Sequence, residues 1–409
     1  MQSQPHAADG VADDGRSPAR LSRRTVLGGL GAAAVAGCVS SGPETASPFQ
    51  IGAVLPLSQG WEAYGNTMLR AVEIGADRLE SSELLGDREV TVQVEDTQVD
   101  PQTTRDRASR LLDQEDVDVL FGPVSSANRI AMAPLLEEHG TPGLYAVEYE
   151  GSVAEDYCNP WLFKTAEVPI QQIEPFVPWL LDEYGTDFYL LGSDYVWPEQ
   201  MNATTAAVLE SAGGTVLDEQ YVALGEDDFS SIIPRIEDAD PDVLFMTLTG
   251  PSVPSIQEQM QNFGVRGQWI DVGISHGQGL LAGAPAGAVE GVVSCHTYME
   301  ALDTERNREF VREFRDRGEA MPITFLTGTA RIAMDLLTAA IEAEGETSAE
   351  ALRSGLDGVS AETVAGDVSI DVDHQATLPT RVSRVDDART HVPVEHFDAV
   401  EPAEFCDGI

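Results

Sequence analysis

The sequence predicts an α/β fold made of two lobes, each built on a parallel β-sheet. Beyond residue 50, short apolar runs typical of buried strands alternate with longer segments whose apolar residues recur at helical spacing. Successive strands begin roughly 25–30 residues apart, which is the length of a strand–helix–strand unit. Two such series follow one another, the second beginning at Pro169, so we expect two Rossmann-like lobes of similar construction.

The first series begins directly after residue 50. A helix is predicted over Asn66–Leu79, where Met68 and Val72 begin an apolar face. Asp100 and Pro101 mark the start of a second helix, because an aspartate caps the free amides and proline suits the first helical position. A third helix is expected over Arg129–Glu138. The strands of this series are Ile51–Pro56, Glu89–Glu95, Asp116–Phe121, Gly143–Val147 and Trp161–Thr165.

The second series starts with a helix over Pro169–Tyr184, whose apolar residues recur at helical spacing. Its strands are expected near Asp187, Thr215, Asp242 and Gln268 and over Gly291–Cys295, with helices near Pro198, Phe229 and Pro251. Two longer helices and two short strands follow, at Thr304–Arg315, Phe325–Glu344, Val364–Ile370 and Arg381–Val385. The last residues are acidic and include prolines, so we expect a poorly ordered tail over residues 399–409.

The chain is strongly acidic. It has 69 Asp and Glu against 24 Lys and Arg, a net charge of −45, and Lys164 is the only lysine. Acidic residues occur in every segment, so the surface repels itself at low salt and is screened at high salt. This composition resembles that of proteins from extreme halophiles. It argues against nucleic acid and anionic membrane surfaces as partners.

The N-terminal 38 residues have the order of an export signal. Arginines precede an apolar segment, Val26–Gly37, which is too short to span a bilayer. Ser22–Leu27 resembles a twin-arginine signal, and Val35–Cys38 resembles a lipobox, whose cysteine is lipidated after cleavage. Residues 39–48 form a flexible tether rich in Ser, Gly and Pro. We expect an exported protein anchored by lipid on Cys38 to the outer face of the cell membrane; the alternative is an amphipathic helix with an unrelated cysteine.

The turns after the predicted strands carry hydroxyls and aromatic rings. The most distinctive is Gly192–Pro198, which places Tyr195 and Trp197 between a buried strand and a helix expected to begin at Pro198. Similar turns lie at residues 57–65, 122–128, 145–151, 247–250 and 273–277. The carboxyl ends of parallel strands share one edge of a sheet, so together these turns predict a polar cleft with aromatic walls. Singly, each turn could be no more than a capped turn.

These motifs resemble those of the type 1 periplasmic binding proteins, the solute receptors of leucine-type ABC transporters, over nearly all of the chain after the tether. The narrower resemblance is to the branch that binds urea and short-chain amides. The motifs that carry it are Gly192–Pro198 with Asn202 and, more weakly, Tyr149–Gly151, Gln171–Gln172, Asp228–Phe229 and Gly366–Asp371 with His374.

The resemblance implies two lobes that are joined by a three-segment hinge and close on a small solute. It implies an N-terminal lobe of residues 49–165 and 296–362 and a C-terminal lobe of residues 166–295 and 363–398. It also implies a monomer without catalysis, cofactor or metal that works with ABC permease and ATPase subunits. The ligand-binding residues would be Ser125, Ser126, Tyr145, Glu148, Tyr149, Tyr195, Trp197, Thr249 and Ser275.

Two departures from the amide branch lie on the ligand face of the C-terminal lobe. Ile274–Gly277 stands where that branch has a Ser-Ile-Ala-Glu-like segment, and Thr249–Pro251 lacks the usual Asn-Gly-Asp pattern. Neither Ser275 nor His276 offers a fixed negative charge to an amino-acid ammonium, although Asp194 is a possible substitute if it does not cap its helix. We expect a small neutral or zwitterionic solute, with urea or a short amide preferred over a branched-chain amino acid.

Two other function classes stay open. Gly273–Gly277 matches the G-x-S-x-G nucleophile elbow, which makes an extracellular serine hydrolase using Ser275 a second hypothesis. The glycines that follow are poor helix formers, which disfavours an elbow here. A chemosensory receptor with the same binding fold is a third hypothesis, supported by no transmembrane or signalling segment.

The histidines and cysteines give weaker signals. His391 and His396 have no third ligand at convincing spacing, so a solvated tail is expected rather than a metal site. Cys158, Cys295 and Cys406 remain after the lipobox. An oxidising compartment allows one disulfide among them, and three separate thiols are an equal alternative.

Overall fold

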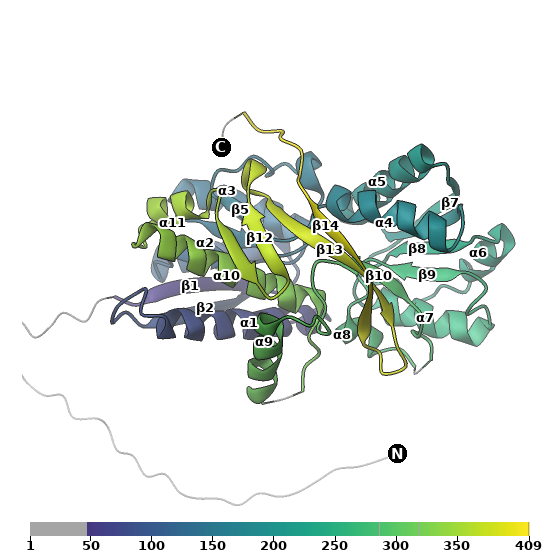
Figure 1. Cartoon of the computed structure of the whole chain (residues 1–409), viewed down its shortest axis with the longest axis horizontal. Helices are drawn as coiled ribbons and strands as arrows, with labels where there is room; N and C mark the ends of the chain where they lie inside the picture. Colours follow the sequence, from purple (N-terminus) through teal and green to yellow (C-terminus); the bar gives the residue numbers. More distant parts are fainter. Residues whose placement is uncertain (1–46, 286, 319, 408) are drawn as a thin grey trace, which may run out of the picture. The chain divides into compact units, whose positions relative to one another are not determined.

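The computed structural model describes residues 47–285, 287–318, 320–407 and 409. Two β-sheets with flanking helices organise this part of the chain (Figure 1). Within these ranges, no helix combines the length and the apolarity needed to cross a membrane. The predicted twin-arginine signal and lipobox, including Cys38, lie outside the described residues.

The first sheet is parallel throughout and has the strand order β2-β1-β3-β4-β5. Its strands are β1 (Phe49–Leu55), β2 (Val90–Asp96), β3 (Val119–Phe121), β4 (Gly143–Tyr145) and β5 (Leu162–Lys164). The helices between them are α1 (Glu62–Ser81), α2 (Pro101–Gln114) and α3 (Ser126–His139). Helix α2 begins as predicted, because the Asp100 carboxylate accepts a hydrogen bond from the Thr103 amide at 2.7 Å.

The second sheet has the order β11-β12-β13-β10-β9-β8-β6-β7, and β14 pairs with β13. Its parallel part holds β6 (Asp187–Ser193), β7 (Thr215–Val222), β8 (Val243–Thr247), β9 (Ile270–Gly273) and β10 (Val293–His296). Antiparallel strands extend it, namely β11 (Ser360–Thr363), β12 (Gly366–Ile370), β13 (Ala376–Val385) and β14 (His391–Val400). Its helices are α4 (Pro169–Glu183), α5 (Val196–Ala212), α6 (Ile233–Ala239), α7 (Ser252–Phe263) and α8 (Gln278–Leu281).

The chain passes between the two lobes more than once. It leaves the first sheet after β5 and returns after β10, because the next helices pack on the first hydrophobic core. These helices are α9 (Glu305–Asp316), α10 (Phe325–Glu344) and α11 (Ala349–Leu356). Strand β13 then runs back toward the second lobe, and β14 returns antiparallel beside it (Figure 1). Apolar residues between β11 and the start of β13 also join the first core, namely Val364, Ala365, Val368, Ile370, Ala376 and Leu378. The lobe boundaries implied by the resemblance stay a prediction.

Two local expectations were wrong. Helix α5 begins at Val196, so Pro198 is its third residue; proline is tolerated there because the first amides of a helix lack helical partners in any case. The solvated tail expected at His391 and His396 is instead strand β14 (His391–Val400), and farther along Cys406 is bonded to Cys158. Cys295 remains a buried free thiol.

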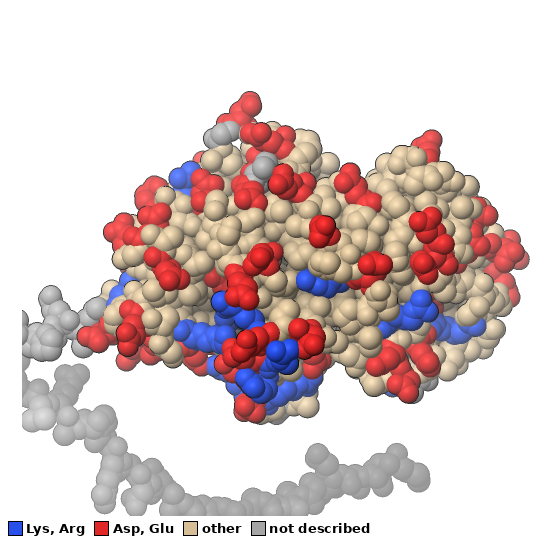
Figure 2. Space-filling model, in the orientation of Figure 1, with Lys and Arg blue, Asp and Glu red and all other residues tan. Residues whose placement is uncertain are grey.

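The surface charge is uneven on the face shown in Figure 2. Acidic side chains are spread over both lobes, whereas most cations gather around α1 and α9. Several of these arginines are paired with acidic neighbours, as Arg78 is with Glu313 at 2.8 Å. The acidic charge is therefore dispersed over the molecule rather than concentrated in one patch.

Candidate functional site

A small cavity of about 50 Å³ lies between the carboxyl ends of the two sheets. The turns after β1, β3 and β4 contribute Trp61, Tyr64, Val124, Ser125, Ser126, Val147 and Glu148. The turns after β6, β8 and β9 contribute Tyr195, Trp197, Thr249 and Ser275, and the start of α10 adds Phe325 and Leu326. Both sheets therefore present their strand-end turns to the same space, as expected for ligand sites in parallel sheets.

Aromatic rings form much of the wall. Tyr195 and Trp197 are stacked, with ring centroids 6.3 Å apart and planes at 29°. Trp61 and Tyr64 meet edge to face on the first lobe, with centroids 5.5 Å apart. Such rings present flat apolar faces that can cover a planar molecule.

The two lobes touch at the edge of this cavity. Burial raises the pKa of Tyr64, partly opposed by a hydrogen bond that its phenol oxygen accepts from the Gly250 backbone amide, and this contact joins the first lobe to the second. Gly250 has a φ of +58°, and a Cβ built on it would lie 3.5 Å from Nε1 of Trp61. The structure therefore has its lobes in contact around the cavity.

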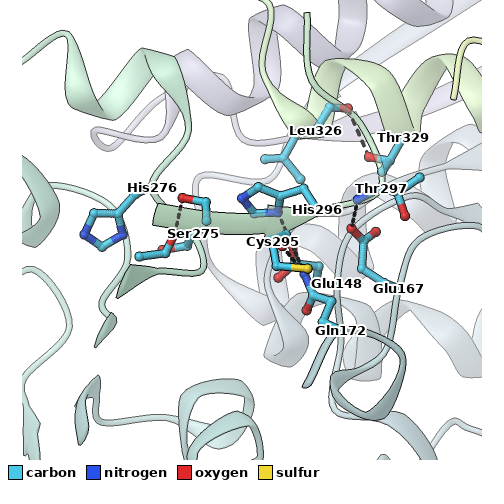
Figure 3. Close-up of polar contacts among 12 residues, drawn as sticks. Glu148, Glu167, Gln172, Ser275, His276, Cys295, His296, Thr297, Leu326 and Thr329 are labelled. Carbon is cyan, nitrogen blue, oxygen red and sulfur yellow. Dashed lines mark hydrogen bonds and ion pairs between the residues drawn. The ribbon is translucent and has the colours of Figure 1, made fainter. Parts of the chain in front are cut away.

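Glu148 is the acidic residue of the lining. Its Oε1 accepts a hydrogen bond from Nε2 of Gln172 at 3.1 Å and lies 3.1 Å from Nδ1 of His296 (Figure 3). Burial raises the pKa of Glu148 to about 8, and the hydrogen bond from Gln172 only partly opposes this. The Glu148 carboxyl is therefore mainly protonated and neutral at pH 7.

Most of the predicted ligand-binding residues line the cavity, but two lie behind its wall. The Tyr145 hydroxyl donates to the Val124 carbonyl at 2.9 Å, and the Tyr149 hydroxyl donates to Oε1 of Gln375 at 2.7 Å. Both rings are buried, and neither is among the lining residues. Their position suits support of the wall rather than direct contact with a ligand.

Asp194 neither offers its carboxylate to the cavity nor caps its helix, the two roles considered for it from the sequence. Its side chain is exposed and is not part of the cavity lining. Helix α5 has Tyr195 at its N-cap position and no capping hydrogen bond from a side chain. The cavity therefore receives no carboxylate from this turn.

The geometry around Ser275 does not form a nucleophile elbow. Its hydroxyl donates a hydrogen bond to the Leu248 carbonyl, and the His276 ring points away from it (Figure 3). Both ring nitrogens of His276 are buried without a hydrogen-bond partner among the described residues. The helix that follows, α8, is only 4 residues long. A serine nucleophile needs an adjacent base, so this arrangement suits a cavity hydroxyl.

Several lining residues were not predicted. Trp61 and Tyr64 lie in the strand-end turn at residues 57–65, where their aromatic character could have identified them. Phe325 and Leu326 follow no strand. The local sequence feature beside them is the N-cap residue Thr324, whose hydroxyl accepts a hydrogen bond from the Thr327 amide at 3.3 Å. That signal predicts a helix start and says nothing about a cavity.

Comparison with known proteins agrees with this architecture. Residues 48–390 match the periplasmic binding protein family. A Leu/Ile/Val-binding protein homolog of Brucella abortus is 26% identical over 340 residues, covering 79% of this chain and 83% of the relative. The leucine-binding protein LivK of Thermotoga maritima has a TM-score of 0.74 at 20% identity, covering 86% of this chain and 99% of that structure.

A solute-binding protein of Rhodopseudomonas palustris, solved with 3,4-dihydroxybenzoic acid, gives a TM-score of 0.79. It is 21% identical and covers 87% of this chain and 98% of that structure.

The fold and the cavity at the strand ends of both sheets define a two-lobe solute-binding protein. The chain belongs to the periplasmic binding protein family. Substrate-binding proteins of ABC importers share this fold, and they work outside the cytoplasm with permease and ATPase subunits. The matched relatives are solute-binding proteins rather than enzymes, which confirms the predicted class and removes the hydrolase hypothesis.

Proposed function

We propose that this receptor binds urea or a short-chain amide and is held on the outer face of the cell membrane by lipid on Cys38. The observation that carries the proposed ligand class is the charge of the cavity. Its lining contains neither Arg nor Lys, and Glu148 is mainly protonated at neutral pH. A neutral solute fits this environment, because a buried charge without a partner costs several kcal/mol.

The size of the cavity supports the same class. A volume of about 50 Å³ corresponds to roughly three to five water-sized positions. Urea and acetamide are molecules of this size, whereas leucine and benzoate are larger. With the lobes in contact through Tyr64 and Gly250, a larger solute would require the lobes to separate.

The polar groups of the lining complement an amide. Trp197 has a buried Nε1 without a hydrogen-bond partner among the described residues, and an indole N–H can donate to a carbonyl oxygen. Both described bonds of Glu148 go to Oε1, so Oε2 can serve the N–H groups of a solute. The stacked Tyr195 and Trp197 rings would cover its planar face.

The role of Trp197 can be tested by titrating the full-length protein with acetamide and urea. Trp197→Phe keeps an aromatic ring but replaces the indole with a smaller phenyl that has no N–H, and one lost hydrogen bond of about 1 kcal/mol weakens affinity roughly fivefold. Trp179→Phe is a matched control, because Trp179 packs on the core of the second lobe and does not line the cavity. Equal affinity in the Trp197 variant and the control would contradict this role.

A branched-chain amino acid is the second candidate. It is favoured by the Leu/Ile/Val-binding relatives. The cavity offers such a ligand aromatic and apolar surface but no cation for its carboxylate. We rank it below a short amide for that reason.

A further inference from the structure

Three buried ionisable side chains meet beside the cavity. Glu148 follows β4, Glu167 lies between β5 and α4, and His296 ends β10, so they come from separate segments of the chain. Their exposed fractions are 7%, 0% and 3%. One nitrogen of the histidine and one oxygen of each glutamate lie within 4.8 Å of one another.

Arg381 interacts electrostatically with Glu167, but it forms no ion pair with the cluster. Among the described residues, no arginine or lysine forms an ion pair with Glu148 or Glu167. Oε1 of Glu167 accepts a hydrogen bond from the Thr297 amide at 2.7 Å, but its Oε2 is buried without a partner. The nearby Arg381 guanidinium donates instead to the carbonyls of Thr297 and Ala365. Two ionised carboxylates would be strongly unfavourable in such an environment.

We propose that Glu148, Glu167 and His296 form a binding site for one divalent transition-metal ion, such as Zn²⁺ or Mn²⁺. Two carboxylates would balance the charge of the ion, and one imidazole with carboxylate oxygens suits these metals. Ligand atoms around a tetrahedral ion at about 2.1 Å stand roughly 3.4 Å apart. The ligand atoms of Glu148 and His296 are 3.1 Å apart, close to this spacing, and the three ligand atoms of the cluster lie within 4.8 Å of one another.

Neighbouring groups already orient the proposed ligands. Gln172 donates to Glu148, and the Thr297 amide donates to Glu167, so both carboxylates are held by hydrogen bonds. Such outer contacts fix ligand geometry in metal sites. Three protein ligands leave a fourth position for water. Local sequence spacing could not predict this site, because its ligands are far apart in the chain.

A metal ion here would connect segments that link the two lobes. Glu148 also lines the solute cavity and would release its proton on binding the ion, so occupancy of the metal site and affinity for the solute would affect each other reciprocally. The metal titration is done without solute, so its outcome does not depend on the identity of the solute. Its test therefore stands whether or not the proposed ligand class is correct.

The test uses the full-length protein freed of metal with EDTA and then dialysed into about 2 M KCl, which screens adventitious binding to surface carboxylates. Calorimetry with ZnCl₂ should show one site per chain. CoCl₂ should give visible d–d absorption bands that report nitrogen and oxygen ligands. Glu167→Gln and His296→Gln should each weaken binding by at least tenfold and remove the bands.

Matched controls remove the same groups just outside the cluster. Glu300→Gln and His391→Gln should keep stoichiometric binding, because neither residue belongs to the cluster. Glu167→Gln preserves the shape of the side chain, whose oxygen can still accept a hydrogen bond from the Thr297 amide. A cooperative melting curve in EDTA verifies that this variant folds. No stoichiometric binding by the wild type, or equal binding by Glu167→Gln, would overturn the proposal.

Discussion

Nδ1 of His296 lies 3.1 Å from Oε1 of Glu148, although the two residues are 148 positions apart in the chain. The contact joins the end of β10 to the turn after β4. Burial raises the pKa of Glu148 to about 8 and lowers that of His296 to about 4, so both groups are mainly neutral at pH 7. A neutral polar centre beside the cavity suits an uncharged solute.

The first prediction concerns pH and stability. Burial raises the pKa of Glu167 to about 7, whereas an unfolded glutamate titrates near pH 4.3, at about its ordinary value. Between these two values the native state keeps a proton that the unfolded chain releases. The raised pKa therefore lowers stability progressively as pH rises through this window. The melting temperature of Glu167→Gln should therefore exceed that of the wild type by more at pH 8 than at pH 4.

Both proteins are melted in EDTA and high salt, so that neither metal nor surface charge contributes to the difference. The same gain at both pH values would show that Glu167 does not titrate as proposed.

The second prediction concerns the disulfide between Cys158 and Cys406, which are separated by 248 residues. Cross-links over long loops stabilise mainly by restricting the unfolded chain, so Cys158→Ser should lose about 2–5 kcal/mol of unfolding free energy. Chemical denaturation measures this loss. A reducing agent should destabilise the wild type and leave the stability of Cys158→Ser unchanged. An equal loss of stability in both proteins would mean that the disulfide does not stabilise the fold.

The third prediction concerns salt. The net charge of −45 should destabilise the folded protein when it is unscreened. Between about 0.1 M and 2 M KCl the Debye length falls from about 10 Å to below about 3 Å. The melting temperature should rise steeply over this range, and a flat dependence would contradict stabilisation by screening.

The fourth prediction concerns anchoring. If Cys38 carries lipid, Cys38→Ser should move the mature protein from the membrane fraction to the medium. Immunoblots of the two fractions measure this change, with Cys295→Ser as the control for loss of an unrelated cysteine. Membrane retention of the Cys38 variant would contradict a lipid anchor at this position.

The sequence was sufficient to predict the strand–helix alternation and the position of most of the cavity lining. Parallel strands bring their carboxyl ends to one edge, so residues after different strands, such as Ser126 and Trp197, were predictable neighbours. Phe325 was not predictable in this way, because α10 follows no strand. The cluster of Glu167 and His296 depends on where the chain passes between the lobes, which local patterns do not specify.

The C-terminal end shows a different limit. Pro393 argues against a strand by local rules, yet it lies in β14, which pairs only with β13 and has a register shift beside it. Proline is tolerated on an edge strand or at a bulge, where its missing N–H is not needed. The amides of Phe405 and Cys406 then donate to the Asp373 carboxylate, a contact between segments that no local pattern indicates.

The most direct test of the proposed ligand class is calorimetry of the full-length protein in about 2 M KCl with acetamide, urea, leucine and 4-hydroxybenzoate. The neutral lining and the small cavity predict heat of binding from acetamide or urea and none from leucine or 4-hydroxybenzoate. Micromolar binding of leucine together with silent amides would contradict the proposal. It would mean that the lobes open to a larger cavity whose charge differs from the one described.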